Sequence, residues 1–324
     1  MNHSIVENRA TARTSAADDT PYSKAIHPNV TDSAEVTNLN NPTSMSTAFD
    51  LATVNKALAN TRFAAKLHHF PTIDSTNLHA VEAANSGAPD GHVSIADEQT
   101  AGRGRGGHTW HSTAGDGLYV SVIVRPKMDL AQALWISLST GLAVQRAIHE
   151  TTGLTPDIRW PNDILLGSAV TGIRKCGGIL VETATTSAAK LKFAVIGIGI
   201  NVNHESFPPE LESLATSLLR ETNITSGQPH PNKKISRETL LYHLLLALDD
   251  EIRTLESELS GQSAPTLLDR FARASSWVRN KRVRVDESGG YTGLTAGLDE
   301  RGFLLVQGDD GILHTVLSGG VRPE

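Results

Sequence analysis

A loop rich in glycine and arginine, from Gln99 to Ser112, carries the residue types best suited to bind an anion. It reads QTAGRGRGGHTWHS. Glycine has no Cβ atom and lets a backbone approach a ligand closely, while Arg103 and Arg105 carry planar, permanently charged groups that suit phosphate or carboxylate oxygens. Exposed amides beside such groups form an anion cradle. The loop alone is equally consistent with a nucleotide phosphate site and with a flexible surface segment that contacts RNA.

The same loop matches the dinucleotide-binding fingerprint G-x-G-x-x-G through Gly102, Gly104 and Gly107. That fingerprint requires a helix immediately after the last glycine. The residues that follow, beginning at His108, show no helical apolar repeat. We therefore reject a dinucleotide site.

Three further polar sets interrupt apolar stretches. The turn Trp160–Asp163 presents an amide and a carboxylate after a proline that must end or bend a strand. Lys175 is a cation that glycines follow closely, and the alternative interpretation is an ordinary solvated lysine. The segment Ser75–Asn77 either caps the following helix or binds a polar ring. Together these sets offer cations that can bind phosphate and a carboxylate that can bind a metal ion or accept a proton. This combination suits nucleotidyl transfer, in which positioning and charge stabilisation supply most of the rate.

A mixed α/β framework must position these sets. Apolar repeats every three or four residues predict helices near residues 49–58, 134–144 and 241–259. Alternating or continuous apolar residues predict strands at 92–97, 118–124, 178–182 and 193–201, and the last is apolar on both sides and therefore central. Beyond about Ser275, short strands separated by Gly and Asp turns predict a small all-β barrel. We expect a disordered tail (1–45), a catalytic domain (46–274) and a C-terminal barrel (275–324).

Composition limits the function further. The 324 residues include 29 basic and 35 acidic side chains, for a net charge of −6, so no general basic surface indicates nucleic-acid binding. The one cysteine, Cys176, cannot form an internal disulfide, which fits a reducing compartment. No apolar run approaches the roughly 18–20 residues that span a bilayer, and the N-terminus lacks an apolar signal core. The expected location is the cytoplasm.

At this point the polar sets match a known family. Five motifs, in their order and spacing, resemble those of biotin–protein ligases, the enzymes that attach biotin to carboxylase carrier domains, over roughly four-fifths of the chain. They are Ser75–Asn77, Gln99 with Gly102–Gly107 and Trp110, Trp160–Asp163, Lys175–Ile179 and Gly197–Asn201. The resemblance implies a mixed-sheet catalytic domain of the class II synthetase-like biotin/lipoate ligase type, followed by a small β-barrel.

The resemblance also implies a two-step reaction. Biotin carboxylate attacks the α-phosphate of ATP, with Mg²⁺, to give biotinyl-5′-AMP and pyrophosphate; a carrier lysine then attacks the acyl carbon and AMP leaves. The implied partner is the biotin carboxyl carrier domain of an acetyl-CoA, propionyl-CoA or pyruvate carboxylase, and a homodimer is compatible with the family. No DNA or membrane partner is expected.

Site residues carry over by motif. The resemblance assigns catalysis to Lys175, Arg105 and Asp163, with Asp163 either binding metal or deprotonating the incoming amine. It assigns nucleotide binding to Arg103, Arg105, Trp110, Asn162 and Asn201. It assigns biotin binding to Ser75, Thr76, Asn77, Gln99, Gly102, Arg103, Gly104, Trp110, Lys175, Gly178, Ile179 and Gly197.

The chain departs from its relatives at a few positions. Gly106 and His108 stand where many relatives have basic residues, so the loop carries less charge, and Arg159 replaces a lysine. The N-terminal segment has no helix-turn-helix spacing, so a repressor function is expected to be absent. The rival hypotheses are a lipoate or octanoyl ligase or transferase of the same fold, a biotin-responsive regulator without enzymatic activity, and an RNA-binding Gly/Arg protein.

Overall fold

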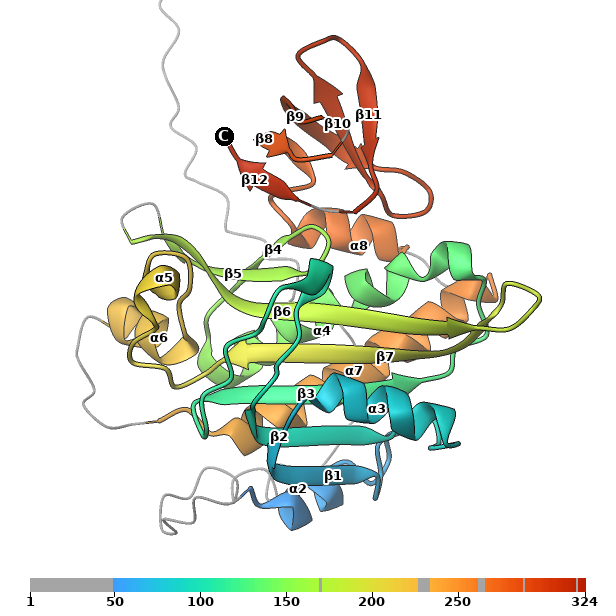
Figure 1. Ribbon diagram of the computed structural model, residues 1–324, viewed down its shortest axis with the longest axis vertical. Helices are drawn as coiled ribbons and strands as arrows, with labels where there is room; N and C mark the ends of the chain where they lie inside the picture. The colour runs from blue at the N-terminus through green and yellow to red at the C-terminus, as the bar shows by residue number, and fades with distance from the viewer. Residues whose placement is uncertain (1–48, 169–170, 227–233, 262–265, 288, 319) are drawn as a thin grey trace, which may run out of the picture.

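A computed structural model describes residues 49–168, 171–226, 234–261, 266–287, 289–318 and 320–324. A seven-stranded mixed sheet, in the order β1-β2-β3-β7-β6-β5-β4, forms the centre of the molecule (Figure 1). Only β1 and β2 pair in parallel, and every other neighbouring pair is antiparallel. The strands are β1 Leu67–Ile73, β2 Val93–Gln99, β3 Gly117–Val124, β4 Asp157–Arg159, β5 Asp163–Ser168, β6 Gly172–Thr185 and β7 Leu191–Asn201.

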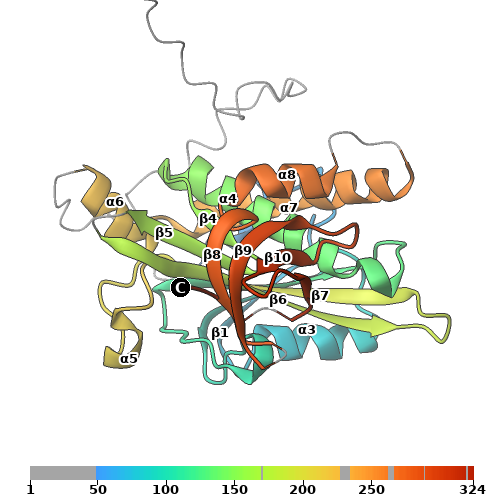
Figure 2. The same cartoon turned by 90° about the horizontal axis from the view of Figure 1, so that it is seen from above.

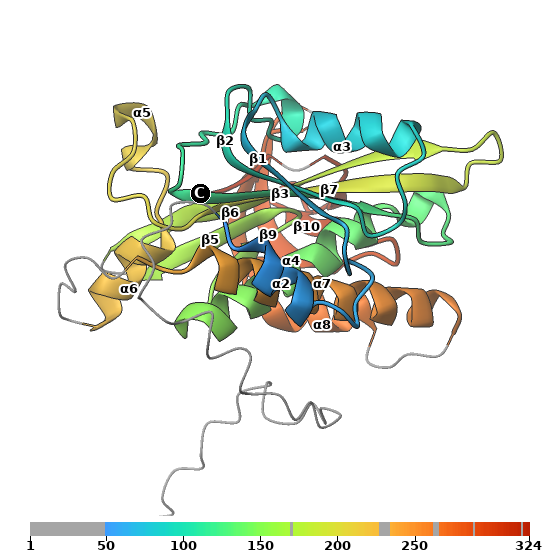
Figure 3. The same cartoon turned by 90° about the horizontal axis from the view of Figure 1, so that it is seen from below.

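Helices cover both faces of this sheet. Figure 3 shows α3 on one face and α2, α4, α7 and α8 on the other. The α-helices are α2 Leu51–Ala57, α3 Thr76–Asn85, α4 Leu134–Thr152, α5 Pro209–Glu212, α6 Leu218–Ser226, α7 Arg237–Leu259 and α8 Leu267–Ala274, with short 3₁₀ turns η2 Arg105–Gly107 and η3 Leu130–Gln132. The predicted α/β class is confirmed. No helix in the described part of the chain is long and apolar enough to cross a membrane.

Strand β3 illustrates how the sequence makes this layering. Successive side chains of a strand point to opposite faces of its sheet. Val120 and Val122 therefore join the large core under α4 and α7, while Ile123 joins a smaller core under α3 together with Ala80 and Phe193. Because both faces are covered, every residue of β3 is buried.

The C-terminal region forms a second, antiparallel sheet in the order β11-β10-β9-β8-β12. Its strands are β8 Arg279–Val285, β9 Tyr291–Leu298, β10 Leu304–Gly308, β11 Leu313–Val316 and β12 Val321–Pro323. The sheet is strongly curved (Figure 2), but its edge strands β11 and β12 are not paired with each other within the described ranges. The predicted strands are present, and closure into a barrel is not seen, because a barrel requires a ladder between the edge strands.

One apolar core extends from the large sheet into the C-terminal sheet. Trp277, Val283 and Val306 belong to the same buried cluster as residues of α4 and β7. The indole of Trp160 also donates a hydrogen bond to the carbonyl of Gly302, at 2.9 Å. We therefore keep the division into 46–274 and 275–324 as a proposal, with the two domains sharing one core. The predicted tail, residues 1–45, lies outside the described residues.

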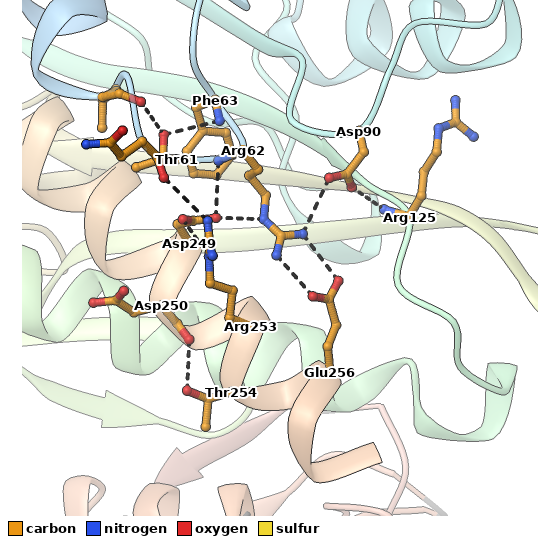
Figure 4. Close-up of polar contacts among 12 residues, drawn as sticks. Thr61, Arg62, Phe63, Asp90, Arg125, Asp249, Asp250, Arg253, Thr254 and Glu256 are labelled. Carbon is orange, nitrogen blue, oxygen red and sulfur yellow. Dashed lines mark hydrogen bonds and ion pairs between the residues drawn. The ribbon is translucent and has the colours of Figure 1, made fainter. Parts of the chain in front are cut away.

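A largely buried arginine joins the segment before β1 to α7 (Figure 4). The Arg62 side chain is 11% exposed and pairs with Asp249 at 2.8 Å, Glu256 at 3.2 Å and Asp90 at 3.5 Å. Burial lowers the pKa of Arg62, but these carboxylates outweigh it and the net pKa is raised. The cluster fixes the segment before β1 against α7, which lies far away in the sequence.

Removing this cation should destabilise the fold. Arg62→Ala leaves the Asp249 carboxylate, 5% exposed, with Arg253 as its ion-pair partner, whose side chain is 57% exposed. We expect the free energy of unfolding in urea to fall by about 2 kcal/mol, the effect of losing a hydrogen bond between charged groups. The matched control is Arg284→Ala, whose side chain is 59% exposed where it pairs with Asp286, and which should cost less than about 1 kcal/mol. Equal losses in the two variants would contradict the structural role given to Arg62.

Candidate active site

A small, partly open hollow of about 40 Å³ lies between the glycine loop and the strands β6 and β7. In Figure 1 the loop that follows β2 crosses the sheet in front of β7 and β6. The hollow collects residues from all five motifs found in the sequence. Its lining is Ser75, Thr76, Asn77, Gln99, Arg103, Gly104, Arg105, Trp110, Ser121, Asn162, Lys175, Gly178, Ile179, Leu180, Gly197, Ile198 and Gly199.

The glycine loop is a narrow hairpin. The amide of Trp110 donates to the carbonyl of Gly102 at 2.8 Å, and the amide of Gly104 donates to the carbonyl of His108 at 2.7 Å. Its tip is η2, where Gly106 and Gly107 have φ of 67° and 81°. Residues with a side chain rarely adopt such angles, so the tip requires glycine. The hairpin carries Arg103 on its first arm and Arg105 at the start of its tip.

The start of α3 forms the polar floor of the hollow. Ser75 caps the helix, because its hydroxyl accepts a bond from the amide of Leu78. Both the amide and the hydroxyl of Thr76 donate to Oε1 of Gln99, at 2.9 and 3.0 Å, and Nε2 of Gln99 donates to the Ser112 hydroxyl at 3.0 Å. Ser75 caps α3 as predicted, and Ser75, Thr76 and Asn77 also line the hollow, while their binding of a polar ring stays a prediction.

Two polar residues of this site were not predicted from the sequence. The Ser121 hydroxyl lies 2.8 Å from Oγ1 of Thr76 and 3.1 Å from Oδ1 of Asn77. Glu182 accepts a hydrogen bond from Nδ2 of Asn77 and pairs with Arg103 at 3.1 Å. The available signal was the same in both cases, a polar side chain inside an otherwise apolar strand.

An indole ring rests on the bare backbone of β6 and β7. A Cβ atom at Gly199 would lie 2.6 Å from Cε2 and Nε1 of Trp110, and one at Gly178 would lie 3.0 Å from Cζ3. Lys175 places its Nζ 5.4 Å from the centre of the same ring, within reach of a cation–π interaction. Within the described chain, Nε1 of Trp110 has no hydrogen-bond partner although it is buried.

Lys175 lies within a charged cluster at the mouth of the hollow. Its Nζ is 2.5 Å from Oδ1 of Asp163, whose Oδ2 pairs with Arg159 at 2.6 Å. Burial raises the pKa of Asp163, but Lys175 and Arg159 outweigh that effect and the net pKa is lowered. Asp163 is therefore an ionised counter-ion that holds Lys175 in place.

The two loop arginines differ in their partners. Arg103 is bound to Glu182, whereas the Arg105 guanidinium makes no hydrogen bond or ion pair with any residue that the structure describes. Burial lowers the pKa of Arg105, and the charges of Asp163 and Glu287 act against that effect. Arg105 is the loop cation that remains free to bind an anion.

Three predicted residues lie outside the lining. Asp163 stands behind Lys175. Gly102 is at the base of the hairpin, where a Cβ atom would lie 2.6 Å from the Trp110 carbonyl. Asn201 is buried at the end of β7, and its Nδ2 donates to the carbonyl of Thr216 at 3.1 Å. The remaining predicted residues are brought together around one hollow.

Comparison with known proteins identifies the class to which this fold and site belong. Residues 69–201 match the model of the biotin/lipoate A/B protein ligase family. The chain is 35% identical over 248 residues to the bifunctional ligase/repressor BirA of Bacillus subtilis, covering 76% of this chain and 70% of that protein. It is 35% identical over 253 residues to the biotin–[acetyl-CoA-carboxylase] ligase of Mycobacterium tuberculosis, covering 76% and 84%.

Solved structures agree. The biotin protein ligase from Aquifex aeolicus in complex with biotin and ATP is 26% identical, with a TM-score of 0.60, covering 80% of this chain and 98% of that one. The fold and the site thus define a ligase of the biotin/lipoate type. More narrowly, this chain belongs to the biotin protein ligase family.

The contact between Trp110 and β7 can be tested directly. Gly199→Ala must displace the indole, because a Cβ atom 2.6 Å from the ring has no room. We expect the backbone amides of residues 102–110 to exchange hydrogen about tenfold faster, measured by mass spectrometry. In Gly141→Ala, the new methyl group would lie 3.4 Å from Ile158, an ordinary contact, and loop exchange should not change. Wild-type protection of the loop in Gly199→Ala would contradict this packing.

Proposed function

We propose that this chain activates biotin with ATP to biotinyl-5′-AMP, releases pyrophosphate and transfers the biotinyl group to a lysine of a carrier domain. The observation that carries the proposal is the convergence of all five motifs on one hollow that Lys175 lines. A polar floor, a bare backbone strip and a cluster of cations suit the three parts of biotin and its adenylate, namely the ureido ring, the apolar body and the charged end.

The floor supports binding of the ureido ring, which carries two N–H donors and a carbonyl acceptor. Ser75, Thr76, Asn77 and Ser121 present hydroxyl and amide groups there, and they are almost fully buried. These groups are already bonded to one another, to Gln99 and to Glu182, and their hydroxyl and amide oxygens have further acceptor capacity for the N–H groups of the ring. We assign the apolar body of biotin to the surface of Gly178, Ile179 and Gly197 beside the Trp110 ring, with Gln99 and Gly104 in the wall and Gly102 at the base of the hairpin.

The cations support the first chemical step. In that step a carboxylate oxygen of biotin forms a bond to the α-phosphorus and the bond to pyrophosphate breaks. Negative charge develops between the two reacting groups, and Lys175 is the cation that Asp163 fixes beside the hollow. Donors fixed in advance stabilise such charge without reorganising. Arg105 is assigned to the phosphate, with Arg103, Trp110, Asn162 and Asn201 completing the proposed nucleotide site.

Magnesium is the metal that the resemblance implies. The described residues contain no group of three His, Cys, Asp or Glu side chains able to hold a metal ion. Both oxygens of Asp163 are engaged by Lys175 and Arg159. Magnesium commonly binds through substrate phosphates and water with few protein ligands, so we take Mg·ATP as the substrate and derive no step through a metal held by the protein. The metal-binding role of Asp163 stays a prediction from the resemblance.

In the second step the carrier amine attacks the acyl carbon and AMP leaves. The lowered pKa of Asp163 makes this carboxylate a weak base, so its principal proposed role is to orient Lys175. An acyl-adenylate is open to attack by water, which gives the hairpin over the hollow a function in excluding solvent. The proposed acceptors are the carrier domains of acetyl-CoA, propionyl-CoA or pyruvate carboxylases, and a homodimer remains a further proposal.

Transfer to a carrier domain tests this function. The purified chain is incubated with biotin, Mg·ATP and a carrier domain, and the carrier is then probed with avidin. We expect labelling that requires both ATP and the acceptor lysine. A parallel reaction with lipoate or octanoate should leave the carrier unmodified, as judged by intact mass. An unlabelled carrier would contradict the proposal.

Lys175 should matter most in the first step. In Lys175→Ala the cation beside the reacting oxygens is lost, and we expect the rate of biotin-dependent pyrophosphate release to fall about a hundredfold. The matched control is Lys192→Ala, which removes an exposed lysine of β7 outside the hollow and should leave that rate unchanged. Wild-type pyrophosphate release by Lys175→Ala would remove Lys175 from the mechanism.

A further inference from the structure

A continuous chain of polar contacts begins and ends on the glycine hairpin. It starts at Arg103, passes through Glu182 and the floor, and returns by way of Gln99 to the backbone of Trp110. Each link is a hydrogen bond or an ion pair. The residues in order are Arg103, Glu182, Asn77, Ser121, Thr76, Gln99, Ser112 and Trp110. The hairpin is therefore fastened to the floor at both of its sides.

Glu182 is the only carboxylate in this chain of contacts, and its chemistry fixes the orientation of Asn77. A carboxylate only accepts hydrogen bonds, while an amide has a donor end and an acceptor end. Nδ2 of Asn77 therefore faces Glu182, and Oδ1 faces Ser121 and the hollow. A Cβ atom at Gly197 would lie 2.4 Å from that Oδ1, so the acceptor reaches past the open backbone of β7.

The same carboxylate holds the hairpin. Its oxygens lie 3.1 and 3.2 Å from the Nη2 and Nη1 atoms of Arg103. A planar guanidinium paired through two nitrogens is held in orientation as well as in position. The side chain of Glu182 is 29% exposed and that of Arg103 is 45% exposed, so the pair alone is a weak fastening. Its importance lies in the link to Asn77.

We propose that Glu182 is a positioning residue with two roles: it presents Oδ1 of Asn77 as an acceptor to the substrate ring, and it anchors Arg103 so that the hairpin closes over a correctly formed floor. This inference rests on the proposed function, since the ring is the ureido ring of biotin. Ser121 has one hydroxyl hydrogen for two neighbouring acceptors. One acceptor is therefore left for an N–H group of the ring.

Two substitutions separate the roles. Glu182→Gln keeps an oxygen that accepts from Asn77 but removes the charge that binds Arg103. Glu182→Leu removes both. Biotin affinity is measured by isothermal titration calorimetry, and closure of the hairpin is measured as the dissociation rate of preformed biotinyl-5′-AMP. Urea unfolding checks that each variant folds.

We expect Glu182→Leu to raise the Kd of biotin about tenfold, the effect of losing one hydrogen bond to a charged group. Glu182→Gln should change that Kd by less than about threefold. Both variants should release biotinyl-5′-AMP about tenfold faster. Arg103→Gln should release biotinyl-5′-AMP at least as fast, because it removes this ion pair and a proposed nucleotide contact, and adding Glu182→Gln to it should cause no further change, because the ion pair is already lost.

The matched control is Glu82→Gln. Glu82 is an exposed carboxylate on α3, the helix that carries Asn77. Among the residues that the structure describes, its side chain has no hydrogen-bond or ion-pair partner. The substitution removes one negative charge near the floor without touching the chain of contacts, so it should leave both readouts unchanged.

Two results would overturn this inference. One is an unchanged Kd of biotin in Glu182→Leu. The other is a Glu182→Gln variant in which the Kd of biotin and the dissociation rate of biotinyl-5′-AMP rise by the same factor. Failure of the wild-type chain to form biotinyl-5′-AMP would instead overturn the proposed function, and the inference with it.

Discussion

The register between β6 and β7 is the constraint on which the site depends. Antiparallel pairing sets Gly178 opposite Gly199 and Leu180 opposite Gly197. Two glycines side by side on neighbouring strands expose a strip of backbone on which the Trp110 ring lies. A slip of one residue would turn every side chain of a strand to the opposite face, and the strip would be replaced by branched side chains such as Ile198. The apolar core beneath the sheet and the open surface above it are thus fixed by the same pairing.

Charge is distributed unevenly over that surface. Three of the four cations near the hollow already have carboxylate partners: Lys175 and Arg159 share Asp163, and Arg103 is held by Glu182. These partners keep positive groups at fixed positions where mutual repulsion would otherwise spread them. Arg105, at the tip of the hairpin, has no such partner among the described residues. The arrangement separates cations that shape the site from one that is available to a ligand.

Much of this could be predicted from local sequence. Apolar alternation located β3, and the order of motifs identified the glycine hairpin, the turn before β5 and Lys175. The features of the site that the sequence did not predict depend on pairing between residues far apart in the chain. Ser121 looked like a polar residue of an alternating strand, and it became part of the floor because β3 packs under the start of α3. Asp163 and Lys175 belong to separate motifs, and only the β5–β6 hairpin brings the two together. The predicted closure of the C-terminal strands into a barrel would need pairing between β11 and β12, which turn residues do not encode and which the described residues do not show.

The hydrogen bond from the Trp160 indole to Gly302 has a consequence for how this protein can be divided. Trp160 is 3% exposed and lies in the turn that carries Asn162. Its indole N–H is satisfied by a loop of the C-terminal sheet, and a Cβ atom at Gly302 would lie 2.9 Å from Leu138 of α4. Cutting the chain after α8 would uncover this tryptophan and strip apolar partners from α4. The C-terminal sheet therefore covers part of the hydrophobic core of the catalytic domain, and a chain cut after α8 would lack part of that core.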